Sequence, residues 1–302
     1  MKVHGLLLLD KPLGLSSNTA LQKVRRLLSA DKAGHGGTLD PMASGVLPLM
    51  FGEGCKLAGA ALTHDKAYEA EVRFGVRTST DDVEGEVIAR SDIRPSADAL
   101  QAALPAFLGW IMQAPPVYSA LKVGGKAMYR LAREGRPVDA VPRRVRVDAI
   151  ELMAFDGGRA RLRIECGKGT YIRSIARDLG EALGCGAHLS GLRRTRVGAF
   201  DVRDAVPLQT LLDGGPVLAA RHLQGLLQLV AGWPRVVLGA DAAVRFGHGQ
   251  GVPLVHLEST EGFGPDAEQV AVLTEGRLLG LGRYGLLPDG RAALLPVRVI
   301  VD

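Results

Sequence analysis

Residues 34–48 of this 302-residue chain read GHGGTLDPMASGVLP, a stretch with four glycines, two prolines and a single carboxylate. Glycine adopts backbone angles that a Cβ forbids, and Pro41 keeps Asp40 extended and outside a helix. The pattern therefore predicts a rigid loop that presents Asp40 as a candidate catalytic carboxylate. The alternative from these residues alone is that Asp40 caps the following turn, a common role for Asp before Pro.

The composition around this stretch is that of a soluble globular protein. Apolar residues make up 47% of the chain and charged residues 23%, which excludes a disordered or coiled-coil protein. The net charge of +5 indicates an anionic partner, either a nucleic acid or a membrane surface. No apolar run approaches the roughly 20 residues that a bilayer requires. We therefore expect a cytoplasmic protein without a membrane segment.

The cysteines and histidines do not form a metal-binding pattern. Cys55, Cys166 and Cys185 are widely separated and include no C-x-x-C pair, which argues against both a disulfide framework and a zinc site. The seven histidines show no H-x-x-x-H spacing. The sequence predicts a protein without a bound metal.

Hydrophobic periodicity predicts alternating strands and helices over the first 230 residues. The predicted strands are 3–9, 66–74, 145–155 and 159–166, and the predicted helices are 16–28, 96–108, 170–183 and one or two within 206–230. In the strand 66–74, Tyr68 lies on the inner face. From residue 235, short Val/Leu runs separated by glycine predict a small all-β domain. The fold class is therefore α+β.

The segment 111–146 concentrates the positive charge of the chain. It holds eight basic residues against two acids, a net charge of +6, whereas the whole chain carries +5. Tyr118 and Tyr129 lie among these charges, and basic side chains with interleaved tyrosines suit phosphates and bases of RNA. We favour an RNA contact here over a solvated surface loop.

Arg173 is placed unusually for its helix. Thr170 is the predicted N-cap, so Arg173 falls in the first turn, where the helix dipole favours acids. A cation placed there indicates a specific partner, such as a carboxylate.

Several segments together resemble the bacterial tRNA pseudouridine-55 synthases, the TruB family. The segments, in the same order as in that family, are DKP at 10–12, the stretch 34–48, KAYEA at 66–70, PPVYSALK at 115–122, GKGTYIR at 167–173 and GAHLSGLRR at 186–194. The resemblance covers the chain from about residue 5 to residue 196.

The resemblance implies a pseudouridine synthase fold with a mixed, mainly antiparallel sheet and flanking helices, followed by a small PUA-like β-domain. We place the catalytic domain at 1–233, with the basic insertion at about 111–146, and the second domain at 234–302. The implied reaction breaks the N-glycosidic bond of uridine 55 in the TΨC loop of tRNA, turns the base over and rejoins it through carbon. Substrate and product are isomers, so no cofactor and no metal are implied.

The resemblance also implies roles for individual residues. Asp40 is the nucleophile, at either C1′ of the ribose or C6 of the uracil, and Arg173 is its partner. Tyr68 stacks on the target base and is a candidate base for a sugar proton.

Substrate-binding residues follow from the same resemblance. Tyr171 and Leu192 line the base pocket, and His35 fills the space that the flipped base vacates. The insertion that folds onto the T-arm carries Lys122, Lys126 and Arg130.

The expected partner is tRNA, with no obligate protein partner and with the chain as a monomer. Residues 240–302 carry five arginines and eight acids, a net charge of −3, so we expect little phosphate binding from the second domain. The alternatives are a T-arm-binding tRNA folding factor without chemistry, and a related synthase that acts on rRNA or with guide RNAs.

Overall fold

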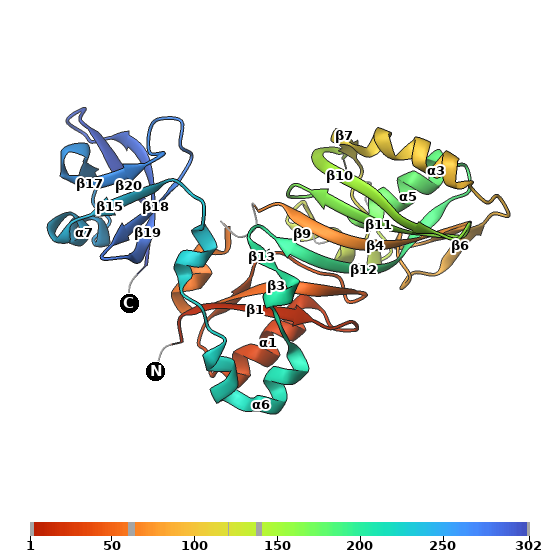
Figure 1. Cartoon of the computed structure of the whole chain (residues 1–302), viewed down its shortest axis with the longest axis horizontal. Helices are drawn as coiled ribbons and strands as arrows, with labels where there is room; N and C mark the ends of the chain where they lie inside the picture. The colour runs from red at the N-terminus through yellow and green to blue at the C-terminus, as the bar shows by residue number, and fades with distance from the viewer. Residues whose placement is uncertain (1–2, 60–63, 120, 137–140, 301–302) are drawn as a thin grey trace.

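The computed structural model describes residues 3–59, 64–119, 121–136 and 141–300. These residues form a large ten-stranded sheet with helices packed on it and a separate six-stranded sheet near the C-terminus, drawn in blue in Figure 1. The α+β class expected from the sequence is confirmed, and so is a small β-domain after the larger one.

The large sheet is mixed. Its strand order is β14-β1-β3-β12-β4-β11-β10-β7, with β2 paired to β3 and β13 paired to β12 off this path. The pairs β1–β14 and β3–β12 are parallel, and the other pairs are antiparallel. The strands are β1 (Gly5–Lys11), β2 (Ala33–His35), β3 (Ala43–Phe51), β4 (Lys66–Phe74), β7 (Gly109–Gln113), β10 (Arg143–Phe155), β11 (Arg159–Cys166), β12 (Ala187–Val197), β13 (Phe200–Asp201) and β14 (Val206–Pro207).

Four helices of this part lie where the sequence predicts them, and α4 was not predicted. The helices are α1 (Ser17–Leu27), α3 (Ala97–Ala103), α4 (Met128–Arg133), α5 (Ile172–Ala182) and α6 (Leu208–Arg221). The α-helix predicted over 96–108 ends at Ala103 and continues as a 3₁₀ turn with Pro105 in it, because proline lacks the N–H of an α-helical hydrogen bond. Helix α6 is kinked at Gly215.

Short elements complete this part of the chain. Strands β5 and β6 form one two-stranded ribbon, and β8 and β9 form another. Their bounds, and those of the 3₁₀ helices, are β5 (Val76–Thr78), β6 (Val87–Arg90), β8 (Lys122–Val123), β9 (Lys126–Ala127), η1 (Gly52–Leu57), η2 (Leu104–Phe107), η3 (Val202–Asp204) and η4 (Leu226–Val230).

Helix α1 fixes the loop that precedes β3. Ser16 caps the helix by accepting a hydrogen bond from the Thr19 N–H at 3.0 Å, which satisfies one of the unpaired donors of the first turn. Ser17 is buried, and its hydroxyl donates to the Leu39 carbonyl at 2.9 Å and accepts from the Leu39 N–H at 2.7 Å. The residue before Asp40 is therefore held to the start of α1.

The predicted cap of α5 is wrong. The N-cap is Tyr171 and its side chain makes no capping hydrogen bond. The Thr170 hydroxyl instead donates to the carbonyls of Gly167 and Arg146, at 3.2 and 3.3 Å. The preceding turn thus competes for the hydroxyl, and α5 begins one residue later than its sequence suggests.

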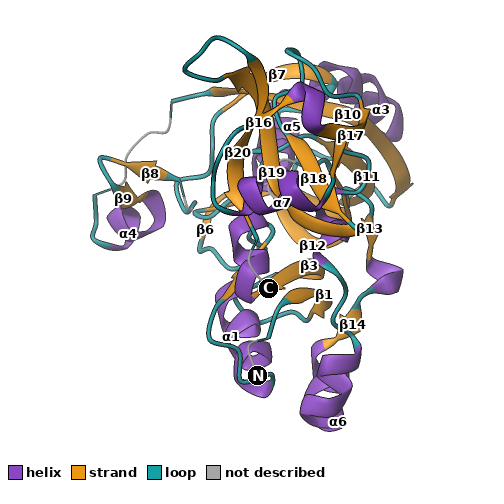
Figure 2. Cartoon of the chain, turned by 90° about the vertical axis from the view of Figure 1, so that its left-hand side faces the viewer, coloured by secondary structure: helices purple, strands orange, loops and turns teal. Residues whose placement is uncertain are grey.

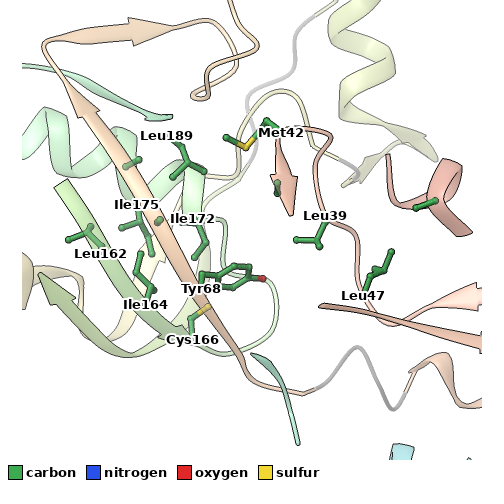
Figure 3. Close-up of a cluster of buried hydrophobic side chains, with 14 of the residues drawn as sticks. Leu39, Met42, Leu47, Tyr68, Leu162, Ile164, Cys166, Ile172, Ile175 and Leu189 are labelled. Atoms are coloured by element: carbon green, nitrogen blue, oxygen red, sulfur yellow. The ribbon is translucent and has the colours of Figure 1, made fainter. Parts of the chain in front are cut away.

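The described residues form three hydrophobic clusters, of which one lies within the small C-terminal sheet and α7 (Ala240–Gly247) and the other two involve the large sheet. The larger of these two joins the large sheet to α1, α3, α5 and α6, and Figure 3 shows part of it around Tyr68, Ile164 and Ile172. The second cluster joins alternate residues of β1 and β3, such as Leu6 and Val46, to Ala271 and Ile300 near the C-terminus. Both faces of β1 and β3 are therefore buried.

The small sheet has the order β16-β20-β19-β18-β15-β17. Its elements are β15 (Arg235–Leu238), α7 (Ala240–Gly247), β16 (Val252–Pro253), η5 (Leu254–His256), β17 (Leu257–Glu261), β18 (Val270–Thr274), β19 (Arg277–Leu286) and β20 (Ala292–Val299). The sheet begins at Arg235, whereas the domain boundary near residue 233 stays a prediction. The domain is built mainly of strands, as predicted, but it is not all-β: it also holds the helix α7, which buries Ala242, Ala243 and Phe246.

Both ends of the basic insertion lie in the large sheet, in β7 and β10, and the part between them stands away from it. Strands β8 and β9 and helix α4 form a small unit that projects to one side in Figure 2. Residues 120 and 137–140 of the insertion lie outside the described residues.

The parallel strands β3 and β12 approach each other closely at Gly45. This glycine pairs with Arg194 in the β3–β12 ladder, and its φ is +110°. A Cβ added to it would lie 2.1 Å from the Arg194 carbonyl oxygen. Only glycine fits this position without moving one of the two strands.

We expect Gly45→Ala to destabilise the fold more than the matched change Gly14→Ala. Gly14 also has a positive φ, +79°, but an added Cβ there meets nothing within 4 Å. Backbone strain alone costs about 1 kcal/mol, whereas strain plus overpacking at Gly45 costs roughly 3 kcal/mol. Urea unfolding of both variants checks this, and equal losses would contradict the clash.

Candidate active site

Asp40 lies in the loop between β2 and β3, and backbone hydrogen bonds hold this loop in place. The Ala43 N–H donates to the Asp40 carbonyl at 3.0 Å, the Gly14 N–H to the Pro41 carbonyl at 2.8 Å and the Gly36 N–H to the Pro48 carbonyl at 2.9 Å. The carboxylate itself faces Arg173. The side chain of Asp40 therefore forms an ion pair rather than capping the turn.

A cavity of about 310 Å³ opens beside Asp40, a volume within the range of small-ligand pockets. Its lining residues are Gly37, Thr38, Leu39, Asp40, Lys66, Tyr68, Ser119, Gly169, Thr170, Tyr171, Ile172, Arg173, Leu192 and Arg194. Five of the residues singled out in the sequence thus share one cavity: Asp40, Tyr68, Tyr171, Arg173 and Leu192. They come from the loop before β3, from β4, from the start of α5 and from β12.

Arg173 is the buried centre of an ion-pair network. Its side chain is 5% exposed, its Nε lies 3.0 Å from Asp40 Oδ2, and its Nη1 lies 3.2 Å from Asp82 Oδ2. Nη1 also donates to the Thr80 carbonyl at 3.0 Å, and Nη2 to the Tyr118 carbonyl at 2.9 Å. Every nitrogen of the guanidinium has an acceptor, as burial of a charge requires.

Asp82 belongs to the acidic turn between β5 and β6. Its side chain is 4% exposed. Its Oδ1 accepts from the Thr80 hydroxyl at 2.5 Å and from the Glu84 N–H at 3.0 Å. The preceding residue, Asp81, has a positive φ of 60° and pairs with Arg177, one helical turn beyond Arg173, at 2.9 Å. Two arginines of α5 therefore fix this turn.

Burial raises the pKa of Asp40 above its usual 3.8, and the neighbouring Arg173 guanidinium opposes that shift. Asp82 adds a further upward contribution, and Lys11 a further downward one. The carboxylate is 34% exposed, so it remains accessible from the cavity. The pairing keeps Asp40 ionised more strongly than burial alone would allow.

Tyr68 faces the cavity from the core side of β4. Figure 3 shows its ring between Cys166 and Ile172, with its hydroxyl directed toward the side on which Leu39 lies. Burial raises the pKa of Tyr68 to about 12, so the phenol keeps its proton at neutral pH. Tyr68 thus presents an aromatic face and a neutral hydroxyl.

Arg194 joins the two sides of the cavity. It is 1% exposed, and in the sheet it lies directly opposite Tyr68 on one side and Gly45 on the other. Its Nε donates to the Val46 carbonyl at 2.9 Å and its Nη2 to the Gly37 carbonyl at 3.1 Å. The arginine therefore ties the glycine-rich loop to the strand that carries Tyr68.

Other predicted binding residues do not line this cavity. His35 lies on β2 opposite Leu49; its Nδ1 is buried without a hydrogen-bond partner among the described residues, and burial lowers its pKa. Lys126 lies 3.9 Å from Glu134, and Arg130 donates to the Tyr129 hydroxyl at 3.1 Å on the exposed insertion. The side chain of Lys122 lies outside the described residues.

The sequence reasoning missed Asp82 and Arg194. In the sequence, Asp82 is one of several acids in the polar segment 78–85, and Arg194 follows directly after another arginine. The periodicity of neither segment indicated burial. Among the described residues, no group of three His, Cys, Asp or Glu side chains is placed to hold a metal ion, and no described helix has the length and hydropathy to cross a membrane.

Solved structures with the same fold cover nearly the whole chain. One is the structure of an H/ACA RNP bound to a substrate RNA containing 2′-deoxyuridine; its matching chain is 26% identical with a TM-score of 0.76, and the match covers 99% of this chain and 85% of that one. A second, a Cbf5-Nop10-Gar1 complex, is 28% identical with a TM-score of 0.77 and covers 98% and 85%. The fold is that of a pseudouridine synthase, and the cavity of this fold holds a single carboxylate, Asp40.

Sequence relatives narrow this class. The family model for the TruB family pseudouridylate synthase N-terminal domain matches residues 25–172, and the model for the tRNA pseudouridylate synthase B C-terminal domain matches residues 173–228. The chain belongs to the TruB family. Proteins described as tRNA pseudouridine synthase B are 47% identical in Burkholderia lata, over 99% of this chain and 91% of that protein, and 46% identical in Stutzerimonas stutzeri, over 99% and 96%.

We expect Arg173→Met to lower the free energy of unfolding by roughly 3–5 kcal/mol, because it leaves the buried carboxylate of Asp82 without its cation. The loss at pH 5 is expected to be smaller than at pH 7. Burial raises the pKa of Asp40, and the substitution removes the guanidinium that opposes this shift, so protonation of Asp40 at the lower pH takes away part of the uncompensated charge. Urea unfolding at both pH values measures this.

The matched control for that substitution is Arg203→Met. Arg203 pairs with Asp201 at 2.8 Å, but its side chain is 82% exposed. Exposed pairs contribute about 1 kcal/mol or less, so this variant should unfold like the wild type. If both variants lost a similar free energy of unfolding, burial of the ion-pair network would not be what makes Arg173 important for stability.

Proposed function

We propose that this protein converts uridine 55 in the TΨC loop of tRNA to pseudouridine, acting in the cytoplasm. The proposal rests on one observation above all: the single carboxylate of the glycine-rich loop, Asp40, faces a cavity and is paired at 3.0 Å with a buried arginine. An anionic nucleophile held in this way needs no activation by a separate base. The proposal of a tRNA substrate is supported by the relatives of 46% and 47% identity, which are described as tRNA pseudouridine synthase B.

The reaction exchanges one bond of the nucleoside for another. The bond between uracil N1 and ribose C1′ breaks, the base turns, and a bond between C5 and C1′ forms. The hydrogen of C5 leaves to solvent and N1 gains one, so atoms balance without an oxidant or an energy source. Asp40 supports the exchange by adding either to C1′ of the ribose or to C6 of the uracil.

We assign the remaining cavity residues to holding the substrate. The uridine must leave the RNA stack, which costs a few kcal/mol and requires a receiving pocket. The ring of Tyr68 offers a stacking surface, while its raised pKa disfavours a role as a base in the resting protein. Tyr171 and Leu192 close the cavity walls. His35 does not line the cavity, and we propose it as the residue that fills the position in the RNA that the flipped base vacates.

The alternative from another class is a tRNA folding factor that binds the T-arm without chemistry. A second alternative is guide-dependent action, since one structural neighbour is part of an H/ACA RNP. The buried Arg173–Asp40 pair favours an enzyme over a folding factor, because binding an anionic RNA gains nothing from a carboxylate. The chain is 47% identical to a protein described as tRNA pseudouridine synthase B and 26% identical to the chain of the H/ACA RNP, and this difference favours unguided action on tRNA over guide-dependent action.

The proposal is tested by release of tritium from a tRNA transcript whose uridines are labelled at C5. We expect release with the wild type alone, without any guide RNA, and none above background with Asp40→Asn. Asp40→Asn should still bind tRNA, because it removes a charge that repels phosphate. Asp201→Asn, a carboxylate outside the cavity that pairs with the exposed Arg203, is the control and should keep full activity.

The possible results separate the three functions. Tight tRNA binding without release by either protein would favour the folding factor. Release only after guide RNA is added would favour the guided synthase. Release by Asp40→Asn at the wild-type rate would refute the assignment of Asp40.

We further propose that the basic insertion binds the RNA backbone. Replacing Lys122, Lys126 and Arg130 together by alanine should weaken tRNA binding and reduce the slope of log K against log salt by about 2–3, since each phosphate contact contributes about 0.7–0.9. Titrations at several salt concentrations measure the slope.

The control replaces three exposed arginines of the acidic second domain, Arg277, Arg291 and Arg298. These changes remove the same formal charge from a region whose net charge is −3. We expect little change in the slope. A larger effect from this triple variant than from the insertion variant would move the RNA contact to the second domain.

A further inference from the structure

Gln113 is a buried amide at the end of the edge strand β7. It is 1% exposed, and both ends of its side chain bind one residue. Its Oε1 accepts from the Tyr171 N–H at 2.8 Å, and its Nε2 donates to the Tyr171 carbonyl at 3.1 Å. The side chain thus pairs with the peptide groups of Tyr171 as a neighbouring strand would.

The position of Tyr171 gives this pairing its importance. Tyr171 is the N-cap of α5, and its own side chain does not cap the helix. A helix start without partners for its N–H groups is costly when buried. Gln113 holds the N-cap residue from outside the helix, so it determines where α5 begins. Tyr171 lines the cavity, and Arg173 follows two residues later.

Neighbouring contacts hold the same two segments together. The Ser174 hydroxyl and Arg177 Nη2 both donate to the Ala114 carbonyl, at 2.8 and 3.0 Å. Arg173 Nη2 donates to the Tyr118 carbonyl. In these contacts, side chains of α5 bind the backbone of 114–118. Gln113 acts in the opposite direction, as a side chain that holds the backbone of the helix start.

We propose that Gln113 is a positioning residue for the reaction: it fixes the first turn of α5 and thereby the place of Tyr171 and Arg173 against Asp40. The inference deepens the proposed function and rests on it. Gln113 does not line the cavity and so does not contact the substrate itself. Because we assign the contact with the RNA backbone to the basic insertion, a displaced helix start affects turnover much more than the affinity for the whole tRNA. The proposal also explains why a buried glutamine stands at an otherwise exposed strand edge, where Trp110 and Met112 are open to solvent.

The variant Gln113→Glu tests this through pH. In its protonated form, the introduced carboxylic acid has one O–H donor and one carbonyl acceptor, so it reproduces both bonds to Tyr171. In its ionised form, it has no donor and repels the Tyr171 carbonyl oxygen. Burial raises the pKa of a carboxyl group, so the protonated form persists above the usual glutamate value. The activity of Gln113→Glu relative to the wild type should therefore fall as the pH rises.

The experiment measures single-turnover rates and tRNA dissociation constants for the wild type, Gln113→Glu and Gln113→Ala between about pH 5 and pH 8, the range over which a buried carboxyl group titrates. We expect Gln113→Ala to lose roughly 10- to 100-fold in rate at every pH, as small displacements of reacting groups do, with an unchanged dissociation constant. Gln113→Glu should match Gln113→Ala at the upper end of this range and regain most of the loss at the lower end. Gln250→Glu, an exposed glutamine in the second domain, is the control and should follow the wild type.

A second readout is independent of activity. Hydrogen exchange of a peptide spanning the start of α5 should quicken in Gln113→Ala, while a peptide from β12 should not change. A wild type that is inactive on tRNA, with quicker exchange in the variant, would refute the proposed function alone. An active wild type with the rate and the exchange of Gln113→Ala unchanged would overturn the positioning role, and so would a relative rate of Gln113→Glu that does not vary with pH.

Discussion

The burial of one guanidinium constrains the whole site. Arg173 lies where a charge is expensive to desolvate, and it is retained there by two carboxylates and two backbone carbonyls that approach its nitrogens from different sides. These acceptors belong to chain segments near residues 40, 80–82 and 118, which are far apart in sequence. None of these segments can shift without leaving a buried charge incompletely paired. The rigidity of the glycine-rich loop is therefore a property of the network as well as of the loop.

Much of this arrangement could be predicted from the sequence, because local chemistry specifies it. The alternation over residues 66–74 predicted β4 to the residue, and Ser16 marked the start of α1. The arginine that opposed its helix dipole has the carboxylate partner that such a charge requires. The resemblance to one family then connected Asp40, Tyr68 and Arg173, and the structure brings them into one cavity.

The parts that could not be predicted depend on contacts between distant segments. Asp82, Arg194 and Gln113 are polar residues in short segments, and each is buried only because another part of the chain covers it. A single sequence shows which residues prefer water and does not show which of them receive a partner. The helix α7 was missed for a related reason, since frequent glycines around it suggested turns and its apolar face is only three residues wide.

The place of β12 in the sheet has a consequence for how the chain is made. β12 lies between β3 and β4, parallel to the first and antiparallel to the second, although it follows both by more than a hundred residues. During synthesis, at about 5–20 residues per second, β3 and β4 therefore each present an open strand edge until residue 197 has left the ribosome. Open edges invite pairing with other chains. The outer face of β1 and β3 stays uncovered longer still, until the last strands of the small sheet arrive. The nascent chain thus exposes strand edges and apolar surface for most of its translation, and the cavity beside Asp40 is completed only when about two thirds of the chain has been made.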